Sequence, residues 1–394
     1  MKVIVVQNGA RHHYAIPTVL QNAGVLERFY TDALGNVGLG RWLARGQRLP
    51  AIGPALQRLG NRRVPDSVAG KTMTFTLSSA LDSRLGGDFA GREMVRHGFG
   101  DASLIYSSLG WGRTFLQTAR ERKIPVVVEL YVRPSLWKTY QAEFHAFPGW
   151  EETLPCRDME GAIGTERDPC LVADYVIVPA EGVAEDVAAT HRFPREKIVV
   201  LPYAVGDTFI NVQNQPMPGR VLFAGNASLG KGIHYFAMAA EKLAHRPPPT
   251  AYRPEFRVAG NVTQRVVQQP VCRRLNFLGR VKRAEMAREF AAADVFVLPT
   301  LSEGSAGVTY EALACGVPVI TTKAAGSVVR DGIEGRIVPE RDPVALAEAI
   351  REVVEDREKR DRMAHAARER ARDYTWEKYG ERLVTALKSC TRSA

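Results

Sequence analysis

The segment EGSAGVTYE contains two carboxylates eight positions apart, Glu303 and Glu311, that are candidates for binding a ligand. The apolar run VFVLP before this segment predicts a strand, and VTYEALA predicts a helix that starts near Ala306. Because a helix rises about 1.5 Å per residue, Glu311 lies roughly 7 to 8 Å along the axis from the helix start. One carboxylate then faces a sugar and the other a ribose, across a diphosphate bound at the helix N-terminus. Each glutamate also has a structural interpretation, Glu311 as a surface helix residue and Glu303 as a first-turn acid.

A second candidate site is the loop NASLGKG, which joins the predicted strand RVLFAG to the predicted helix IHYFAMAAEKLA. Gly225, Gly230 and Gly232 leave its backbone open beside a helix N-terminus, which suits a phosphate. Lys231 sits at the positive end of the helix dipole, where a cation is disfavoured by roughly 0.3 to 1 kcal/mol without a neighbouring anion. Its position therefore favours a bound diphosphate. Glycine-bearing loops of this kind have a purely structural role about as often as a ligand-binding one. This loop also matches neither the GxGxxG pattern nor the phosphate loop that ends in GK followed by Ser or Thr.

Short β-rich runs alternate with amphipathic stretches through most of the chain, which predicts an α/β fold with parallel sheets covered by helices. The predicted strands of the first half are KVIVVQ, SLIYSS, IPVVVEL, YVIVP and KIVVLP, and EGVAEDVAATHR predicts a helix between the last two. A second series consists of RVLFAG, FRVAG, LNFLG, VFVLP, PVITT and GRIVP. The sequence after Arg341 is helical in pattern, with a break before Trp376.

The polar segment NVQNQPMPG separates the two series of strands, and we interpret it as an interdomain linker, although a surface loop has a similar composition. The length of 394 residues also favours two domains. We therefore expect an N-terminal domain over residues 1–210, a C-terminal domain over 211–375, and a final helix over 376–394.

The net charge of +10 raises the possibility of an anionic partner, with a solvated arginine-rich surface as the alternative. From Arg41 to Arg63 there are six arginines and no acid, which fits either peripheral contact with anionic lipid or a surface helix packed on its sheet. Nucleic acid is disfavoured as a partner because no array of aromatic side chains interleaves with the arginines. The five cysteines form no CxxC pair, which disfavours a metal site and a disulfide framework. No apolar run reaches bilayer length, so we expect a cytoplasmic protein that contacts the membrane peripherally at most.

From Arg220 to Tyr379 the chain resembles the C-terminal half of the retaining glycosyltransferases of family 4. The resemblance lies in LFAG with KGI, in EGSAGVTYEALACGVPVI, in GSVVRDGIEGRIVPERDPVALAEAI and in YTWEKYGERL. The N-terminal half is similar to the family through DYVIVPAEGVAEDV and KIVVLPYAVGDTF. The resemblance implies the GT-B fold, with two doubly wound Rossmann-like domains facing across a cleft. The N-terminal domain is then the acceptor side, and the C-terminal domain binds the nucleotide sugar. It also implies that the helix from about Trp376 crosses back to the N-terminal domain.

Applied to this sequence, the resemblance assigns the donor site. It implies that Glu311 hydrogen-bonds the ribose hydroxyls, that Lys231 pairs with the diphosphate, and that Glu303 holds the donor sugar, with Glu303 and Lys231 as catalytic residues. The implied donor-binding set is Gly225, Asn226, Lys231, Gly304, Ser305, Ala306, Gly307 and Glu311.

The resemblance also indicates acceptor-side residues and two departures from the family. The loop QNGARHHYAIP is where relatives approach the acceptor, and its candidates are Asn8, Gly9, His12 and His13. A histidine near a strand end is more often a hydrogen-bonded surface residue. Many relatives carry an arginine at the position of Asn226, and Tyr131 takes the place of a histidine that relatives often have. Tyr131 is therefore a further acceptor-side candidate that stacks or donates a hydrogen bond.

The reaction that the resemblance implies is transfer of a hexose-type sugar from a nucleoside diphosphate to an acceptor hydroxyl, with retention at the anomeric carbon. The implied setting is polysaccharide, lipopolysaccharide or glycolipid biosynthesis, with a glycan or lipid-linked acceptor. The chain has no DxD arrangement of aspartates, so we expect no metal and no cofactor beyond the nucleotide-sugar co-substrate. Two alternatives stay open: a nucleotide-sugar epimerase of the same fold, and a non-catalytic nucleotide-sugar-binding protein.

Overall fold

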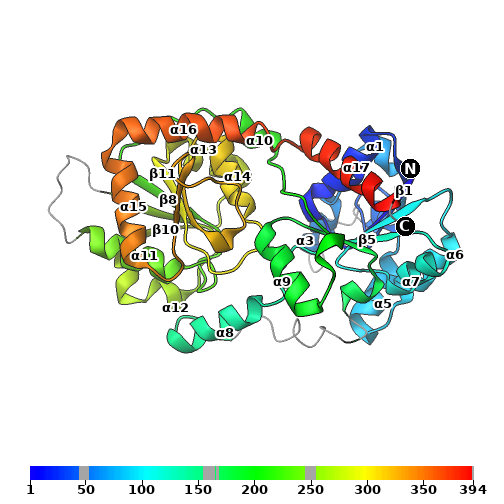
Figure 1. Cartoon of the computed structure of the whole chain (residues 1–394). Coiled ribbons are helices and arrows are strands. Elements are labelled where there is room, and N and C mark those ends of the chain that lie inside the picture. Colours follow the sequence, from blue (N-terminus) through cyan, green and yellow to red (C-terminus); the bar gives the residue numbers. More distant parts are fainter. Residues whose placement is uncertain (44–52, 154–164, 166–167, 245–253, 393–394) are drawn as a thin grey trace.

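Two parallel sheets, each covered by helices on both faces, make up the molecule (Figure 1). The computed structural model describes residues 1–43, 53–153, 165, 168–244 and 254–392. The expected α/β class with two doubly wound Rossmann-like domains is confirmed.

The N-terminal sheet contains seven parallel strands within the described residues. In sheet order they are β3 (Thr72–Thr74), β2 (Leu26–Thr31), β1 (Val3–Gln7), β4 (Leu104–Ser108), β5 (Val126–Glu129), β6 (Tyr175–Val178) and β7 (Ile198–Val200). The five predicted strands are confirmed, whereas β2 and β3 were not predicted. Glu27 and Arg28 interrupt the apolar pattern of β2, and β3 has only three residues.

The helices of this half are α1 (Ala15–Asn22), α2 (Gly38–Leu43), α3 (Gly53–Gly60), α4 (Asp66–Ala69), α5 (Thr76–Leu85), α6 (Phe89–His97), α7 (Arg113–Glu121), α8 (Leu136–Ala146) and α9 (Glu181–His191). Short 3-10 turns add η1 (Arg11–Tyr14), η4 (Pro169–Val172) and η5 (Arg195–Lys197). Helix α9 confirms the prediction made from EGVAEDVAATHR. The helical prediction within residues 41–63 is only partly testable, because residues 44–52 lie outside the described residues.

The C-terminal sheet contains six parallel strands in the part of the chain that the structure describes. Their order is β10 (Leu275–Gly279), β9 (Glu255–Ala259), β8 (Arg220–Ala224), β11 (Val295–Leu298), β12 (Val319–Thr322) and β13 (Gly335–Val338), all at predicted positions. The helices are α10 (Asp207–Ile210), α11 (Ile233–Ala244), α12 (Gln264–Val267), α13 (Arg283–Ala292), α14 (Gly307–Ala314), α15 (Pro343–Glu355), α16 (Arg357–Ala371) and α17 (Trp376–Arg392), with η6 (Pro270–Arg274) and η7 (Lys323–Ala325).

Each sheet changes its winding direction at one point, between β1 and β4 in the first sheet and between β8 and β11 in the second. The central strands are buried along their length, with β1, β4 and β11 buried at every position. Ligands of open α/β sheets bind beyond the carboxyl ends of the strands at such switch points. The loops that follow β1, β8 and β11 are therefore the positions where the fold favours a ligand.

The chain passes between the two halves twice, and the two passages lie side by side. The amide of Val205, after β7, donates to the carbonyl of Tyr374, before α17, at 2.8 Å. Helix α17 then packs on α1, where Gly380 faces Val19 so closely that a Cβ on the glycine would lie 3.0 Å from the valine Cβ. The expected return of the C-terminal helix to the N-terminal domain is confirmed (Figure 1).

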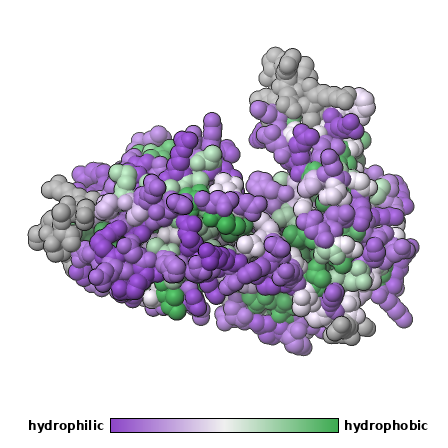
Figure 2. Space-filling model, turned by 90° about the horizontal axis from the view of Figure 1, so that it is seen from above, coloured by the Kyte–Doolittle hydropathy of each residue, from purple (hydrophilic) through white to green (hydrophobic). Residues whose placement is uncertain are grey.

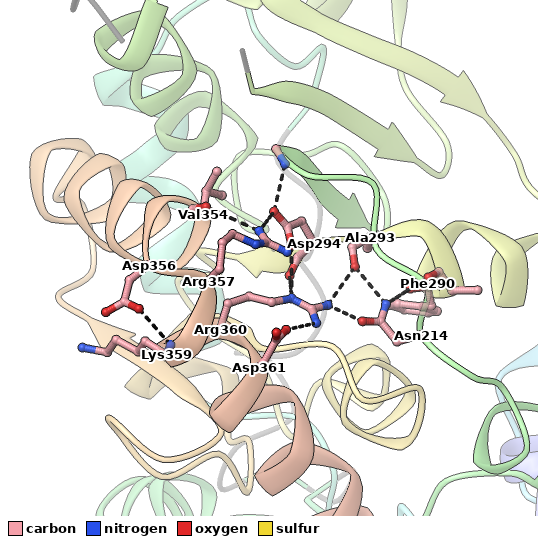
Figure 3. A network of polar contacts seen from close by, with 12 residues as sticks. Asn214, Phe290, Ala293, Asp294, Val354, Asp356, Arg357, Lys359, Arg360 and Asp361 are labelled. Atoms are coloured by element: carbon pink, nitrogen blue, oxygen red, sulfur yellow. Dashed lines mark hydrogen bonds and ion pairs between the residues drawn. The ribbon is translucent and has the colours of Figure 1, made fainter. Parts of the chain in front are cut away.

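A buried polar network fixes the chain that leads into β8 (Figure 3). Asn214 donates to the carbonyls of Ala291 and Ala293, each at 2.9 Å, and its side-chain oxygen accepts from Arg360 on α16. Asp294 is fully buried and pairs with Arg357 at 2.6 Å, also from α16. A charge of this kind is stable away from water only when it is paired, so the network holds α16 against the start of the second sheet.

The surface seen from above is mostly hydrophilic, and its apolar side chains form separate patches (Figure 2). Among the described residues, none of the helices combines the length and the apolar character needed to span a bilayer.

Candidate active site

The loop after β8 adopts a tight conformation that brings Lys231 beside the end of β11. Gly232 has φ of +73°, and a Cβ at this position would lie 2.0 Å from the carbonyl oxygen of Pro299. The carbonyl of Gly230 accepts hydrogen bonds from the amide of Leu301 at 2.9 Å and from the hydroxyl of Thr300 at 3.0 Å. The two candidate loops of the sequence analysis are therefore joined into one structure at the switch point.

Lys231 forms an ion pair with Glu303 across these two loops. The side chains are 25% and 17% exposed, so both are largely removed from water. Burial lowers the pKa of Lys231 to about 8. The position of Lys231 at a helix N-terminus favours a neighbouring anion, and in this structure the carboxylate of Glu303 supplies the countercharge.

The N-terminus of α14 presents free backbone N–H groups to the same place. The amides of Glu303 and Ala306 donate to the carbonyls of Ala324 and Ala325, so these two are already used within the protein. Among the described residues, no hydrogen bond is found for the amides of Gly304, Ser305 and Gly307. Those three amides, at the positive end of a helix, suit an anion such as a phosphate.

This result refines the predicted donor-binding set. The hydroxyl of Ser305 donates to the carbonyl of Gly326 at 2.8 Å, so this residue offers only its amide to a ligand. Ala306 is the N-cap of α14 and its amide is occupied. Gly225, with φ of +141°, and exposed Asn226 begin the loop after β8, and Asn226 accepts a hydrogen bond from Asn261 at 3.1 Å.

Glu311 lies on the second turn of α14 and has an arginine partner that the sequence reasoning missed. The Nη1 atom of Arg283, the first residue of α13, lies 3.6 Å from Oε1 of Glu311, and its guanidinium lies 4.7 Å from the ring centre of Phe209. Burial raises the pKa of Glu311 to about 7, and the charge of Arg283 opposes this rise. Glu311 is therefore a half-buried carboxyl that titrates near neutral pH. In the sequence, Arg283 is marked only by its position shortly after a predicted strand, which does not indicate that it approaches Glu311.

The N-terminal half meets the loop of residues 303–307 at Tyr131. A Cβ on Gly304 would lie 1.8 Å from the carbonyl oxygen of Tyr131, so only glycine permits this close approach. The Tyr131 ring lies under the guanidinium of Arg11, with 3.3 Å between the guanidinium carbon and the ring centre. The predicted acceptor-side position of Tyr131 is thus brought next to the loop of residues 303–307.

Arg11 is a second residue that the sequence reasoning missed. It donates to the buried carboxylate of Glu129 at 3.0 and 3.2 Å and also to the hydroxyl of Tyr203. Burial alone would raise the pKa of Glu129, yet the charge and hydrogen bonds of Arg11 hold it below its usual value. Two signals were available in the sequence: Arg11 stands among the acceptor-side candidates, and Glu129 is an acid at the end of the apolar strand PVVVEL.

The other acceptor-side candidates fall into two groups. His12 packs edge-on against Tyr203 and Trp376, with ring centres 4.6 and 5.2 Å away, and burial lowers its pKa to about 4. Asn8 and His13 are exposed, and the amide of Gly9 donates to Asp32 at 3.0 Å. His12 is therefore a neutral packing residue in this structure, whereas Asn8 and His13 are accessible from solvent.

A large cleft lies beside these groups, with a volume of about 1120 Å³. It is lined from both halves, by His12, His13, Trp376, Asp207 and Arg283 among others. Arg283 lines this cleft and also approaches Glu311, whereas Glu311, Glu303 and Lys231 do not themselves line it.

One grouping with the composition of a metal site lies elsewhere, at Asp168, Cys170 and His191, whose ligand atoms are within 4.8 Å of one another. Asp168 accepts from the amide of Cys170 at 2.8 Å and lies 2.9 Å from Nδ1 of His191. Burial raises the pKa of the Cys170 thiol to about 12, which disfavours the thiolate that metal ions bind. We interpret the group as a cap of the turn η4.

Comparison with known proteins identifies the second half of the chain most clearly. Residues 218–356 match the family model described as "Glycosyl transferases group 1". A D-inositol 3-phosphate glycosyltransferase of Corynebacterium urealyticum is 30% identical over 55% of this chain and 57% of its own length. Its counterpart in Corynebacterium efficiens is 29% identical over 83% of this chain and 80% of its own length. The chain spans about three fifths of the length of the relatives from Corynebacterium urealyticum and Xylanimonas cellulosilytica, 57% and 61% respectively.

Solved structures match over the whole chain at low identity. The Anabaena protein HepE in complex with UDP has a TM-score of 0.62 at 16% identity and covers 99% of this chain and 100% of its own. Sucrose-phosphate synthase from Thermosynechococcus elongatus has a TM-score of 0.63 at 17% identity, and each chain is covered completely. These likenesses concern the fold, and they confirm the expected GT-B architecture.

Proposed function

We propose that the chain is a nucleotide-sugar-dependent glycosyltransferase that moves a hexose-type sugar to an acceptor hydroxyl with retention at the anomeric carbon. One observation carries the proposal: Lys231, Glu311 and three free amides at the N-terminus of α14 lie on the segments that follow β8 and β11, beside the switch point of the second sheet. A cation and free amides suit a diphosphate, and a half-buried carboxylate suits a ribose diol. The family match of residues 218–356 covers these groups and supports the same assignment.

In this proposal the diphosphate replaces the carboxylate of Glu303 as the partner of Lys231. Glu303 then turns to the hydroxyls of the donor sugar, which lies against the loop of residues 303–307. As the anomeric carbon–oxygen bond to the phosphate breaks, charge develops on the diphosphate, and Lys231 and the α14 amides stabilise it. The new bond forms to the acceptor oxygen, and the proton of the acceptor hydroxyl leaves with the diphosphate. Catalysis is then mainly positioning and electrostatic stabilisation, with no metal.

For the acceptor, we propose a glycan or a lipid-linked glycan that enters through the cleft lined by His13 and Arg283. On the N-terminal side His13 lines this cleft, and we propose the exposed Asn8 and the guanidinium of Arg11, which stacks on Tyr131, as further acceptor contacts. Polysaccharide, lipopolysaccharide or glycolipid biosynthesis is the proposed setting.

We further propose a cytoplasmic location with peripheral membrane contact through residues 41–63. Helix α2 exposes Leu39, Trp42 and Leu43, of which Trp42 is 66% exposed. Apolar side chains beside arginines suit the interface of an anionic bilayer. Sedimentation with phosphatidylglycerol vesicles tests this: Trp42→Ala is expected to reduce binding, and equal sedimentation with purely zwitterionic vesicles contradicts the lipid assignment.

The test of the activity is a thermal-shift screen against uridine, guanosine and adenosine diphosphate sugars, followed by turnover on any ligand that raises the melting temperature. We expect UDP-glucose or a related UDP-sugar to stabilise the protein, and slow release of UDP in the absence of acceptor. Conversion of the sugar without any acceptor favours the epimerase alternative. Tight binding with neither transfer nor hydrolysis favours the non-catalytic alternative.

A further inference from the structure

A segment of the N-terminal half reaches across to the donor half of the molecule. Residues 136–152, here named the α8 arm, comprise α8 and the six residues after it, and they lie in sequence between β5 and β6. In space, α8 lies beneath the C-terminal domain, on the side of α11 and α12 (Figure 1). The start of the arm is attached to the N-terminal half, because the amide and hydroxyl of Ser135 both donate to Asp186 of α9 at 2.9 Å.

The centre of the contact is Glu143, which is 2% exposed. Its carboxylate accepts from the hydroxyl of Tyr235 at 3.1 Å and lies 2.9 Å from Nε2 of His234, both on the first turn of α11. Nε of Arg341 donates to its other oxygen at 2.6 Å. A buried carboxylate with this many partners is held in one position, and its removal leaves three polar groups without their acceptor.

Two further contacts fall on the loop that carries Lys231. The ring of Tyr140 packs against Gly230 so closely that a Cβ on the glycine would lie 1.4 Å from the ring. Glu151 accepts from the amide of Leu229 at 2.7 Å. The arm therefore contacts the two residues directly before Lys231, and Glu143 fixes the helix turn directly after it.

Aromatic packing completes the interface. Phe147 and Trp150 of the arm lie edge-on to the fully buried ring of His234, with ring centres 4.3 and 5.6 Å away. The loop of residues 226–232 that the arm contacts also carries Lys231, which pairs with Glu303. The arm therefore packs against the same short loop that carries the lysine of the candidate donor position.

We propose that the α8 arm is part of the donor site, and that Glu143 and Tyr140 are positioning residues that hold the loop of residues 226–232 ready to receive the diphosphate. This inference rests on the proposed donor. The arm touches no candidate ligand position itself and acts through the loop backbone and Lys231. If the loop of residues 226–232 is already ordered before the donor binds, binding costs less conformational entropy. Loss of the arm contacts therefore weakens the donor complex.

The first test measures the unliganded protein by hydrogen–deuterium exchange. In Glu143→Gln and in Tyr140→Ala, we expect faster exchange of amides in residues 226–234, while the amides of β8 keep the exchange rates of the unmodified protein. Glu152→Gln is the matched control, because Glu152 belongs to the same arm and, within the described part of the chain, its side chain contacts Arg265 in an exposed ion pair. If Glu143→Gln does not fold, Tyr140→Ala decides, because it leaves the buried charge in place. Unchanged exchange of residues 226–234 in a folded Tyr140→Ala variant overturns the inference.

The second test measures UDP binding by calorimetry and the KM for UDP-sugar in the slow hydrolysis reaction. Both variants are expected to bind UDP about tenfold more weakly and to raise KM while kcat at saturating donor stays within about twofold, because chemistry is unaltered once the loop is ordered. A lowered kcat at unchanged KM contradicts a positioning role in donor binding. Absence of nucleotide binding by the unmodified protein counts against the proposed function, and the exchange experiment still decides on the arm.

Discussion

Replacing Glu311 by glutamine is expected to stabilise the unliganded protein and to weaken nucleotide binding at the same time. The carboxyl of Glu311 on α14 is half-buried, with 21% of its side chain exposed, and its pKa of about 7 compares with 4.5 for an ordinary glutamate. A shift of this size corresponds to about 3 kcal/mol that the ionised carboxylate costs the folded state above pH 7. Because the folded protein holds the proton more tightly than the unfolded chain, this cost is absent below about pH 4.5 and grows as the pH rises to about 7. Arg283 offsets little of it, since its side chain is 47% exposed.

Urea unfolding at pH 8 and pH 4.5 measures the stability effect of Glu311→Gln. We expect the free energy of unfolding to rise by up to about 3 kcal/mol at pH 8 and to change little at pH 4.5. Glu348→Gln on α15 is the control, because that glutamate is exposed and its replacement is expected to leave both values unchanged.

Calorimetry with UDP measures the functional effect. The glutamine lacks the charge that strengthens hydrogen bonds from ribose hydroxyls, so binding is expected to weaken about ten- to a hundredfold. A variant that binds UDP as the unmodified protein does refutes the ribose assignment. If Glu311→Gln gains no stability at pH 8, burial of the ionised Glu311 carboxylate does not destabilise the folded protein as we infer.

Three other predictions concern the charges of the site. Lys231→Met is expected to lower kcat for donor hydrolysis about a hundred- to a thousandfold with less effect on melting temperature, as measured by steady-state kinetics, because it removes a group that stabilises charge on the diphosphate. UDP affinity measured across pH should rise up to about pH 7 as Glu311 ionises and fall above about pH 8 as Lys231 loses its proton; a flat profile contradicts both roles. Arg11→Met should lower the free energy of unfolding by about 3 to 5 kcal/mol, since it leaves Glu129 buried and unpaired, and the double variant Arg11→Met/Glu129→Leu should recover most of this loss in urea unfolding.

Long apolar strands and glycine-bearing loops made much of the fold predictable from the sequence. The strands of the second sheet, the helix start at Ala306 and the break before Trp376 follow from local patterns and are found where expected. Strand β2 was missed because Glu27 and Arg28 hide its buried face, and β3 because three residues carry no periodicity.

Which of the site residues contact one another could be learned only from the structure. Sequence spacing related Glu303 to Glu311, but the countercharges came from distant positions: Lys231 pairs with Glu303, and Arg283 approaches Glu311. No local pattern reports contacts between loops from different strands or between domains. For the same reason Glu143 in α8 gave no signal in the sequence, although it lies 91 positions from His234 and is buried against it.

The most direct test of the donor site is an experimental structure of the protein with UDP. The account predicts that the ribose hydroxyls lie within hydrogen-bond distance of the Glu311 carboxylate, and that the diphosphate contacts Lys231 and the amides of Ser305 and Gly307. Arg283 is then displaced from Glu311, and Lys231 exchanges Glu303 for the diphosphate. A nucleotide bound elsewhere, with the ion pair between Lys231 and Glu303 intact, contradicts the central claim.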